Sequence, residues 1–152
     1  MKDIVRSISN LVETLNEEEK HQILNQLLKT EGIPISAFKI KLSGLEIIVK
    51  YLKEIENKSF KEISKTLNRS QSTIYNTYKH SKIKFIGNLD ISDSSIKIPY
   101  NIFKNRKYSP LESIISYLKD QQKLSFQQIS HTLNKSYSTI KTVYRRYKIK
   151  NG

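Results

Sequence analysis

Cysteine is absent from the sequence, and so is any long apolar run. Without cysteine the chain can form neither a disulfide framework nor a thiolate metal site, which fits an intracellular location. No apolar run approaches the roughly 20 residues that a membrane-spanning helix needs. The N-terminal segment MKDIVRSISNLVETL alternates polar and apolar residues, unlike the core of a signal peptide. We therefore expect a cytoplasmic protein that does not enter a membrane.

Groups that carry catalysis or bind metals are also sparse. Only four glycines are present, and none belongs to a glycine-rich phosphate loop. His21, His80 and His131 fall in three separate predicted elements, without the paired spacing of metal ligands. The carboxylates lie mostly at predicted helix caps or on exposed faces, so no acid–base pair is indicated. We expect no metal, no cofactor and no enzymatic activity.

The charge is strongly positive and unevenly distributed. The whole chain has a formal net charge of +13 at pH 7. Residues 1–32 contain four Lys and Arg and six Asp and Glu, whereas residues 33–152 contain 23 and 8, a net charge of +15. Such a field attracts a polyanion, and its spread through patterned sequence favours a folded protein that binds nucleic acid.

Two segments of the chain are copies of each other. SFKEISKTLNRSQSTIYNTYKH at Ser59–His80 recurs as SFQQISHTLNKSYSTIKTVYRR at Ser125–Arg146, 66 positions later. Upstream, IPISAFK at Ile33–Lys39 corresponds to IPYNIFK at Ile98–Lys104. The segment between the copies is rich in Gly, Asn, Asp and Ser, as a linker would be. We expect an N-terminal segment at 1–32, domains at 33–87 and 98–152, and a linker at 88–97.

Each repeat predicts three helices. In the first repeat, Ser43 and Ser59 each precede a glutamate by three residues, which is the capping-box signature of a helix start. Asn68 is suited to the left-handed position that ends the second helix, and Ser70 begins the third. The same residues recur 66 positions later, as Ser109, Ser125, Asn134 and Ser136. The expected fold class is all-α, with two tandem three-helix domains after an N-terminal helical hairpin.

The N-terminal segment differs from the repeats. It carries two apolar stripes, formed by Ile4, Ile8, Leu11 and Leu15 and by Ile23, Leu24, Leu27 and Leu28. Asn16 is the expected cap of the second helix. Helices of about a dozen residues are marginal in water, so something must cover the stripes. Two candidates are the first repeat of the same chain and, as we favour, the same hairpin of a second chain in a homodimer.

The second and third predicted helices of each repeat share the pattern F-x-x-I-S-x-x-L-N-x-S-x-x-T-I, which runs from Phe60 to Ile74 in the first copy. This pattern resembles the helix-turn-helix of sigma-factor region four, of response regulators and of recombinases. NR-x-x-x-T-I-x-x-x-Y, from Asn68 to Tyr78, is similar to archaeal helix-turn-helix regulators. The resemblance covers both repeats but not residues 1–32. It implies sequence-specific binding of double-stranded DNA and transcription regulation, with the third helix in the major groove.

Helical spacing assigns the residues that would touch DNA. Ile74 and Tyr78 face inward, so the opposite face of the third helix is free to read bases. The candidate base contacts are Gln71, Ser72, Tyr75, Asn76, Tyr137, Ser138, Lys141 and Thr142. The candidate phosphate contacts, which set register and affinity, are Ser70, Thr73, Lys79, Ser136, Thr139, Arg145 and Arg146.

Other functions stay open at this stage. The chain could be the DNA-binding module of a transposase or recombinase system, although it has no acidic catalytic cluster of its own. It could instead be a sigma-like protein that docks on RNA polymerase or a basal transcription factor. The nine tyrosines could suggest stacking on single strands. However, Tyr51, Tyr117, Tyr78 and Tyr144 fall on inward faces, so core packing is the better explanation.

Overall fold

The computed structural model describes the backbone of residues 1–28 and 31–152, and the side chains of residues 1–23 and 31–152. The protein is all-α apart from one pair of two-residue strands, as the sequence predicted. It divides into a small unit, Met1–Thr30, and a compact body, Glu31–Gly152. Among the helices that the structure describes, none combines the length and apolar character that crossing a bilayer requires.

The N-terminal unit consists of two helices, α1 (Lys2–Glu13) and α2 (Glu17–Leu28). Asn16 caps α2 as predicted: its side chain accepts a bond from the Glu19 amide at 2.8 Å, and the Glu19 carboxylate accepts one from the Asn16 amide at 3.0 Å. No residue of α1 is buried, so the expected hairpin does not bury its first apolar stripe. The side chains of Leu24, Leu27 and Leu28 lie outside the described part of the chain.

The first repeat begins with an arm, followed by three helices. Its elements are β1 (Ile33–Pro34), the 3₁₀-helix η1 (Ile35–Lys39), α3 (Gly44–Glu54), α4 (Phe60–Leu67) and α5 (Gln71–Lys84). The second repeat has the same order, with a π-helical turn at the end of its first helix. Its elements are β2 (Lys97–Ile98), η2 (Tyr100–Phe103), α6 (Pro110–Ser116), η3 (Tyr117–Gln121), α7 (Phe126–Leu133) and α8 (Tyr137–Asn151).

The predicted helix boundaries are set by local capping. Ser43 caps α3 in a full capping box, and Ser109 does the same for α6. Ser59 accepts the Glu62 amide at the start of α4, and Ser125 forms a complete box with Gln128 at α7. Asn68 and Asn134 adopt the left-handed conformation, both with φ 52°, and stop α4 and α7.

The arms of the two repeats are exchanged. β1 pairs with β2 in antiparallel register, with Ile33 opposite Ile98. Beyond the strands, η1 of the first repeat packs on α7 of the second, and η2 of the second packs on α4 of the first. Gly32 permits the close approach of the arms, because a Cβ atom there would lie 2.8 Å from the carbonyl oxygen of Ile98. Each three-helix group is therefore completed by the arm of the other.

This exchange changes the expected domain organisation. We predicted separate domains at 33–87 and 98–152, but residues 31–152 form one compact body. The expected linker, residues 88–97, is also part of this body. Leu89 is buried, and the hydroxyl of Ser36 donates to the carbonyl of Asp90 at 2.8 Å. The segment differs from a free linker because its backbone is bonded to the first arm.

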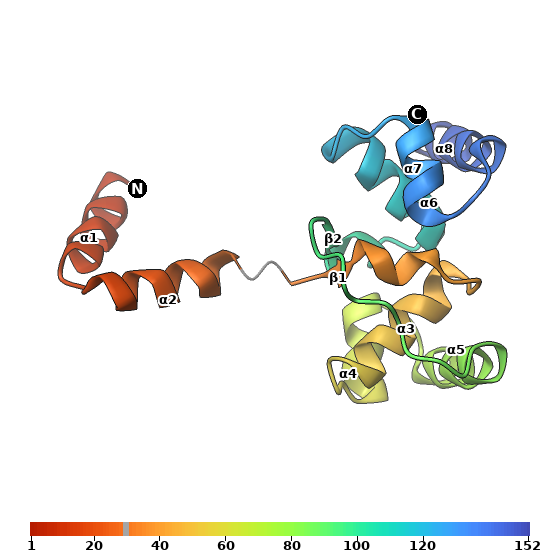
Figure 1. Cartoon of the computed structure of the whole chain (residues 1–152), viewed down its shortest axis with the longest axis horizontal. Helices are drawn as coiled ribbons and strands as arrows, with labels where there is room; N and C mark the ends of the chain where they lie inside the picture. Colours follow the sequence, from red (N-terminus) through yellow and green to blue (C-terminus); the bar gives the residue numbers. More distant parts are fainter. Residues whose placement is uncertain (29–30) are drawn as a thin grey trace. The chain divides into compact units, whose positions relative to one another are not determined.

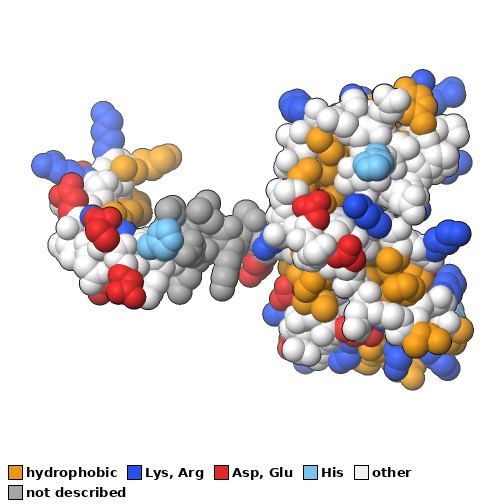
Figure 2. Space-filling view, viewed as in Figure 1, with side chains coloured by type: hydrophobic (Ala, Val, Ile, Leu, Met, Phe, Trp, Pro, Cys, Tyr) orange, Lys and Arg blue, Asp and Glu red, His pale blue; other side chains and the backbone are white. Residues whose placement is uncertain are grey.

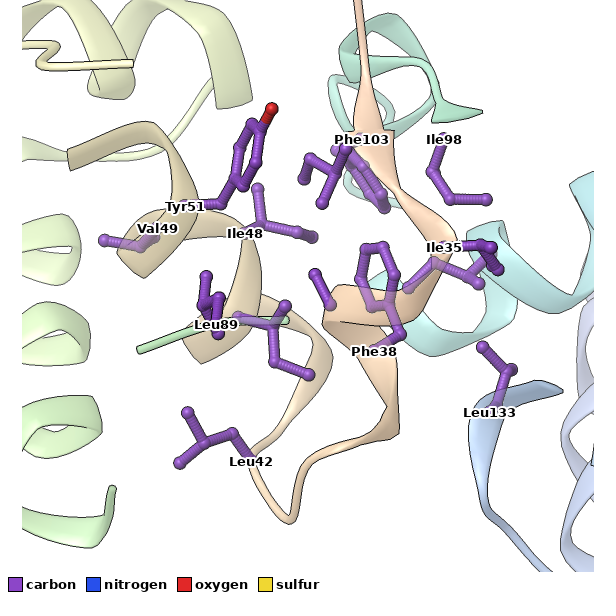
Figure 3. Close-up of a cluster of buried hydrophobic side chains, with 14 of the residues drawn as sticks. Ile35, Phe38, Leu42, Ile48, Val49, Tyr51, Leu89, Ile98, Phe103 and Leu133 are labelled. Atoms are coloured by element: carbon purple, nitrogen blue, oxygen red, sulfur yellow. The ribbon is translucent and has the colours of Figure 1, made fainter. Parts of the chain in front are cut away.

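A continuous hydrophobic core runs through both repeats (Figure 3). Phe38 from η1 and Phe103 from η2 lie near its centre, between Ile48 of α3 and Leu133 of α7. Phe103 is 1% exposed and Phe38 3%. Because the aromatic residue of each arm enters a core shared with the other repeat, loss of either ring should weaken the whole body.

Phe103→Ala tests whether the core is shared. We expect a loss of about 3–5 kcal/mol in the free energy of unfolding, typical of a buried aromatic residue changed to alanine. Unfolding should remain a single transition, measured by urea denaturation with amide NMR signals from both repeats. Ile86→Ala is the control, since Ile86 is 94% exposed. Separate unfolding of the two repeats in the Phe103 variant would contradict a shared core.

Candidate nucleic-acid interface

Helices α5 and α8 lie at opposite ends of the same edge of the body (Figure 1). Each is the third helix of its repeat and packs across the first helix, α5 on α3 and α8 on α6. Ile74 anchors α5, Ile140 anchors α8, and both are fully buried. These contacts fix one face of each helix and leave the opposite face exposed.

A hydrogen-bonded turn fixes how each of these helices begins. The hydroxyl of Ser64 in α4 donates to the backbone carbonyl of Arg69, and Ser130 in α7 bonds to Lys135 in the same way. These bonds span the turn between the second and third helices. The sequence did not predict the bond, because its acceptor is a backbone atom five residues away. The turn holds the first residues of α5 and α8 toward solvent.

All eight predicted base-contact residues are exposed. They are Gln71, Ser72, Tyr75, Asn76, Tyr137, Ser138, Lys141 and Thr142. Within the described part of the chain, the amides of Gln71 and Asn76 form no side-chain hydrogen bond, so their donors and acceptors face water. Gln and Asn can each form two bonds with adenine, and Lys can bond guanine. The arrangement is chemically able to read base edges, and these contacts stay a prediction.

The predicted phosphate contacts fall into two groups. Lys79, Arg145 and Arg146 are exposed cations. The hydroxyls at the helix starts are already occupied in capping: the Ser70 and Thr73 hydroxyls lie 2.8 Å apart, and those of Ser136 and Thr139 lie 2.7 Å apart. The main effect of these hydroxyls is therefore to shape the helix N-terminus. The first backbone amides of a helix lack intrahelical partners and can donate hydrogen bonds to a phosphate oxygen.

Two phenylalanines support the exposed tyrosines, a feature that the sequence did not reveal. Tyr75 packs edge-on against Phe60, with ring centroids 5.5 Å apart, and Tyr137 packs edge-on against Phe126 at 6.4 Å. The amines of Lys53 and Lys119, from the preceding helix of each repeat, lie 4.5 Å from the ring centroids of Phe60 and Phe126. Because Tyr75 is 52% exposed and Tyr137 48%, each ring is held in place while part of it stays open to a ligand.

The tyrosines expected in the core are indeed packed inward. Tyr78 donates to Glu54 at 3.2 Å, and Tyr144 donates to Asp120 at 2.7 Å. Burial and the bond to Asp120 raise the pKa of Tyr144 to about 12. Tyr51 is only 6% exposed. These rings are therefore not available for stacking on bases.

An ion pair ties the end of each outer helix to the start of the first helix. Lys84 of α5 bonds Glu46 at 2.7 Å, and Lys150 of α8 bonds Glu112 at 2.9 Å. Burial opposes ionisation of Glu46 and Glu112, but the lysine bond and the capping-box amide outweigh it. The pKa of both carboxyl groups is therefore lowered. The pairs hold α5 and α8 at a fixed tilt on their repeats.

Histidines and carboxylates are not gathered into a metal site. In the part of the chain that the structure describes, no three His, Asp or Glu side chains are placed to hold a metal ion. His21, His80 and His131 are exposed and belong to α2, α5 and α7. The surface around α5 and α8 thus offers amides, hydroxyls, half-exposed aromatic rings and cations.

Changing Glu46 and Glu112 to Gln should destabilise the body in a pH-dependent way. Because the pKa of each carboxyl is lowered on folding, its contribution is complete above the ordinary value of 4.5 and is lost as the pH falls through the folded value. At pH 7 we expect a loss of at most about 1 kcal/mol per pair, since the lysines are half exposed. Urea denaturation at pH 7 and pH 3 measures this loss in the free energy of unfolding.

Glu62→Gln is the matched control for this comparison, because Glu62 occupies the same position in α4 and is exposed. The difference between the double variant and the unchanged protein should shrink at pH 3. An equal difference at both pH values would show that the ion pairs do not stabilise the body.

The sequence matches no protein-family model, and comparison with curated proteins and with solved structures finds no match to either. No relative therefore supplies a function for the chain. The geometry and charge of the edge formed by α5 and α8 are the observations from which a function can be inferred.

Proposed function

We propose that the body binds double-stranded DNA in a sequence-specific manner through two helix-turn-helix units, α4–α5 and α7–α8, and regulates transcription. One observation carries this proposal: the capped N-termini of α5 and α8, with exposed side chains that can form hydrogen bonds, lie on the same edge of a strongly basic body. An exposed third helix held at its start by a tight turn is the element that enters the major groove in helix-turn-helix proteins.

Charge supports a nucleic acid as the ligand. Residues 33–152 have a net charge of +15, and Figure 2 shows Lys and Arg side chains along the edge of the body where α5 and α8 lie. The last turns of these helices add the exposed cations Lys82 and Lys148. Phosphate contacts from such residues provide most of the sequence-independent affinity of DNA-binding proteins.

A duplex ligand is favoured over a single strand. Single-strand binding relies on aromatic rings that stack on successive bases. Tyr51, Tyr78 and Tyr144 are packed inward, and the half-exposed rings of Tyr75 and Tyr137 belong to two different helices. Action within the cytoplasm, at the nucleoid, belongs to this proposal, as does the absence of enzymatic activity. A role as a recombinase module or as a protein that docks on RNA polymerase or a basal transcription factor is the alternative.

The salt dependence of duplex binding tests the proposal. If the body neutralises about six or more phosphates, the slope of log affinity against log salt should be about −5 or steeper, at about −0.9 per contact. Changing Arg145 and Arg146 to Ala should flatten the slope by about 2. Fluorescence anisotropy with a labelled mixed-sequence duplex measures both effects.

Lys2→Ala serves as the control, since Lys2 is a cation of α1 outside the basic body. Its slope should equal that of the unchanged protein. A chain that fails to bind duplex at low salt is not a DNA-binding regulator, and binding to polymerase would then favour the docking alternative.

We also infer that residues 1–32 form a homodimer contact. The stripe on α1 has coiled-coil spacing, and Ile4, Ile8 and Leu11 are 56–66% exposed. A second copy of the same stripe is a self-complementary cover, and two-fold pairs are the commonest protein assemblies. The net charge of −2 keeps this segment away from DNA and leaves it available to another protein segment.

Sedimentation equilibrium tests this contact. The full chain should sediment as a dimer at tens of micromolar, whereas Ile8→Lys combined with Leu11→Lys should sediment as a monomer, because charges would enter the apolar seam. Ser9→Lys is the matched control, because Ser9 is an exposed residue of α1 next to the stripe. Monomeric sedimentation of the unchanged chain would contradict the dimer.

A further inference from the structure

We infer that the DNA site of this protein is an inverted repeat with one fixed spacing and two unequal half-sites. This inference rests on the proposed function and identifies the class of duplex that the edge formed by α5 and α8 selects. It follows from an internal two-fold relation between the repeats, which neither the tandem sequence nor the predicted linker implied.

The strand pair provides the first evidence for a two-fold axis. Ile33 and Ile98 are equivalent residues of the two repeats, and each lies opposite the other in the antiparallel pair. A residue that faces its own equivalent marks an isologous contact, the kind that a two-fold axis generates. Gly44 and Pro110 repeat the relation: they are equivalent positions, and a Cβ atom on Gly44 would lie 3.2 Å from Cβ of Pro110.

Reciprocal polar contacts provide the second evidence. The side-chain amide of Asn68 donates to the carbonyl of Lys104 at 3.2 Å, and the amide of Asn134 donates to the carbonyl of Lys39 at 3.4 Å. Asn68 and Asn134 end equivalent helices, and Lys39 and Lys104 end equivalent arms. Each turn before α5 or α8 is thus bonded to the arm of the other repeat. A head-to-tail arrangement would not give contacts in both directions.

The same contacts fix the distance between α5 and α8. Arg69, in the turn before α5, also donates to the carbonyl of Phe103 at 3.0 Å. The segment that joins the repeats is held at Ser36, whose hydroxyl accepts from the Asp93 amide at 3.1 Å. With the core shared as well, the two outer helices are parts of one body. Their separation cannot vary as it would across a flexible linker.

A two-fold relation between the outer helices determines the symmetry of the site. The phosphate backbone of duplex DNA has two-fold axes perpendicular to its length, and two-fold helix-turn-helix pairs align with one of them. The two helices then read their half-sites on opposite strands, so the half-sites are inverted. Freely linked tandem domains would accept direct repeats as well, and at several spacings.

The half-sites differ because the exposed faces differ. Asn76 on α5 is replaced by Thr142 on α8, and Tyr75 by Lys141, whose amine lies 5.4 Å from the ring of Tyr137. Asn suits adenine, whereas Lys suits guanine. The protein therefore binds its site in one orientation, although its framework is nearly symmetric.

Selection from a random duplex pool with the full chain is the experiment, followed by a spacing series on the selected site. For each bound body we expect two inverted half-sites at one spacing. Insertion of about five base pairs turns the second half-site to the opposite face of the duplex, which should lower affinity at least about 10-fold. Asn76→Ala should relax base preference in one half-site and Lys141→Ala in the other, each about 5- to 150-fold.

The outcomes separate this inference from the proposed function. Direct repeats, or inverted ones that tolerate every spacing, would overturn the inference while duplex binding stands. Loss of both half-site preferences in a single variant would also overturn it. Absence of any binding to the mixed-sequence duplex would overturn the proposed function itself, and the inference with it. Ile83→Ala, on the α5 surface and 71% exposed, is the control for the variants.

Discussion

The whole body depends on the exchange of arms between the repeats. The side chains of Phe38 and Phe103 fill a core that neither repeat closes with its own arm, and the pairing of β1 with β2 holds both arms in register. The position of α5 relative to α8 follows from this one arrangement. So does the inclusion of the joining segment in the body, through the bonds of Ser36. If each arm packed only on its own repeat, the same sequence would give two separate domains joined by a linker.

The sequence predicted what short-range chemistry determines. Ser43, Asn68 and Ser70 start and stop helices through bonds to backbone atoms within a few residues, so their roles are visible in the sequence pattern. Asn76 was predicted to be exposed because helical spacing places it opposite Ile74. The arm exchange was not predicted, because the arms of the two repeats share the same pattern of Ile, Pro, Phe and Lys. An arm that fits one repeat fits the other, and only the three-dimensional path of the chain decides between them.

At the interface, too, some features were predicted from the sequence and others were visible only in the structure. Phe60 opens the repeated sequence pattern, but the pattern did not show that its half-buried ring supports Tyr75. The equivalent support in the second repeat holds Tyr137, which lies one helical turn earlier, so comparing the repeats position by position does not reveal the shared role. Within one chain the two halves of a symmetric body can diverge independently, as Arg69 and Lys135 have done. In a homodimer one substitution changes both halves.

The route of the chain also has a consequence for synthesis. The ribosome synthesises α3, α4 and α5 before η2, which packs on α4 in the finished body. During that interval the first repeat has its helices but not its cover, because a contact between distant segments must wait until both exist. The second arm therefore packs on the first repeat last. Until then the nascent first repeat exposes the surface that this arm covers, and the arm of a neighbouring nascent chain would also fit there. The short, polar segment of residues 88–97 favours closure within the chain, since nearby ends meet at a lower cost in entropy.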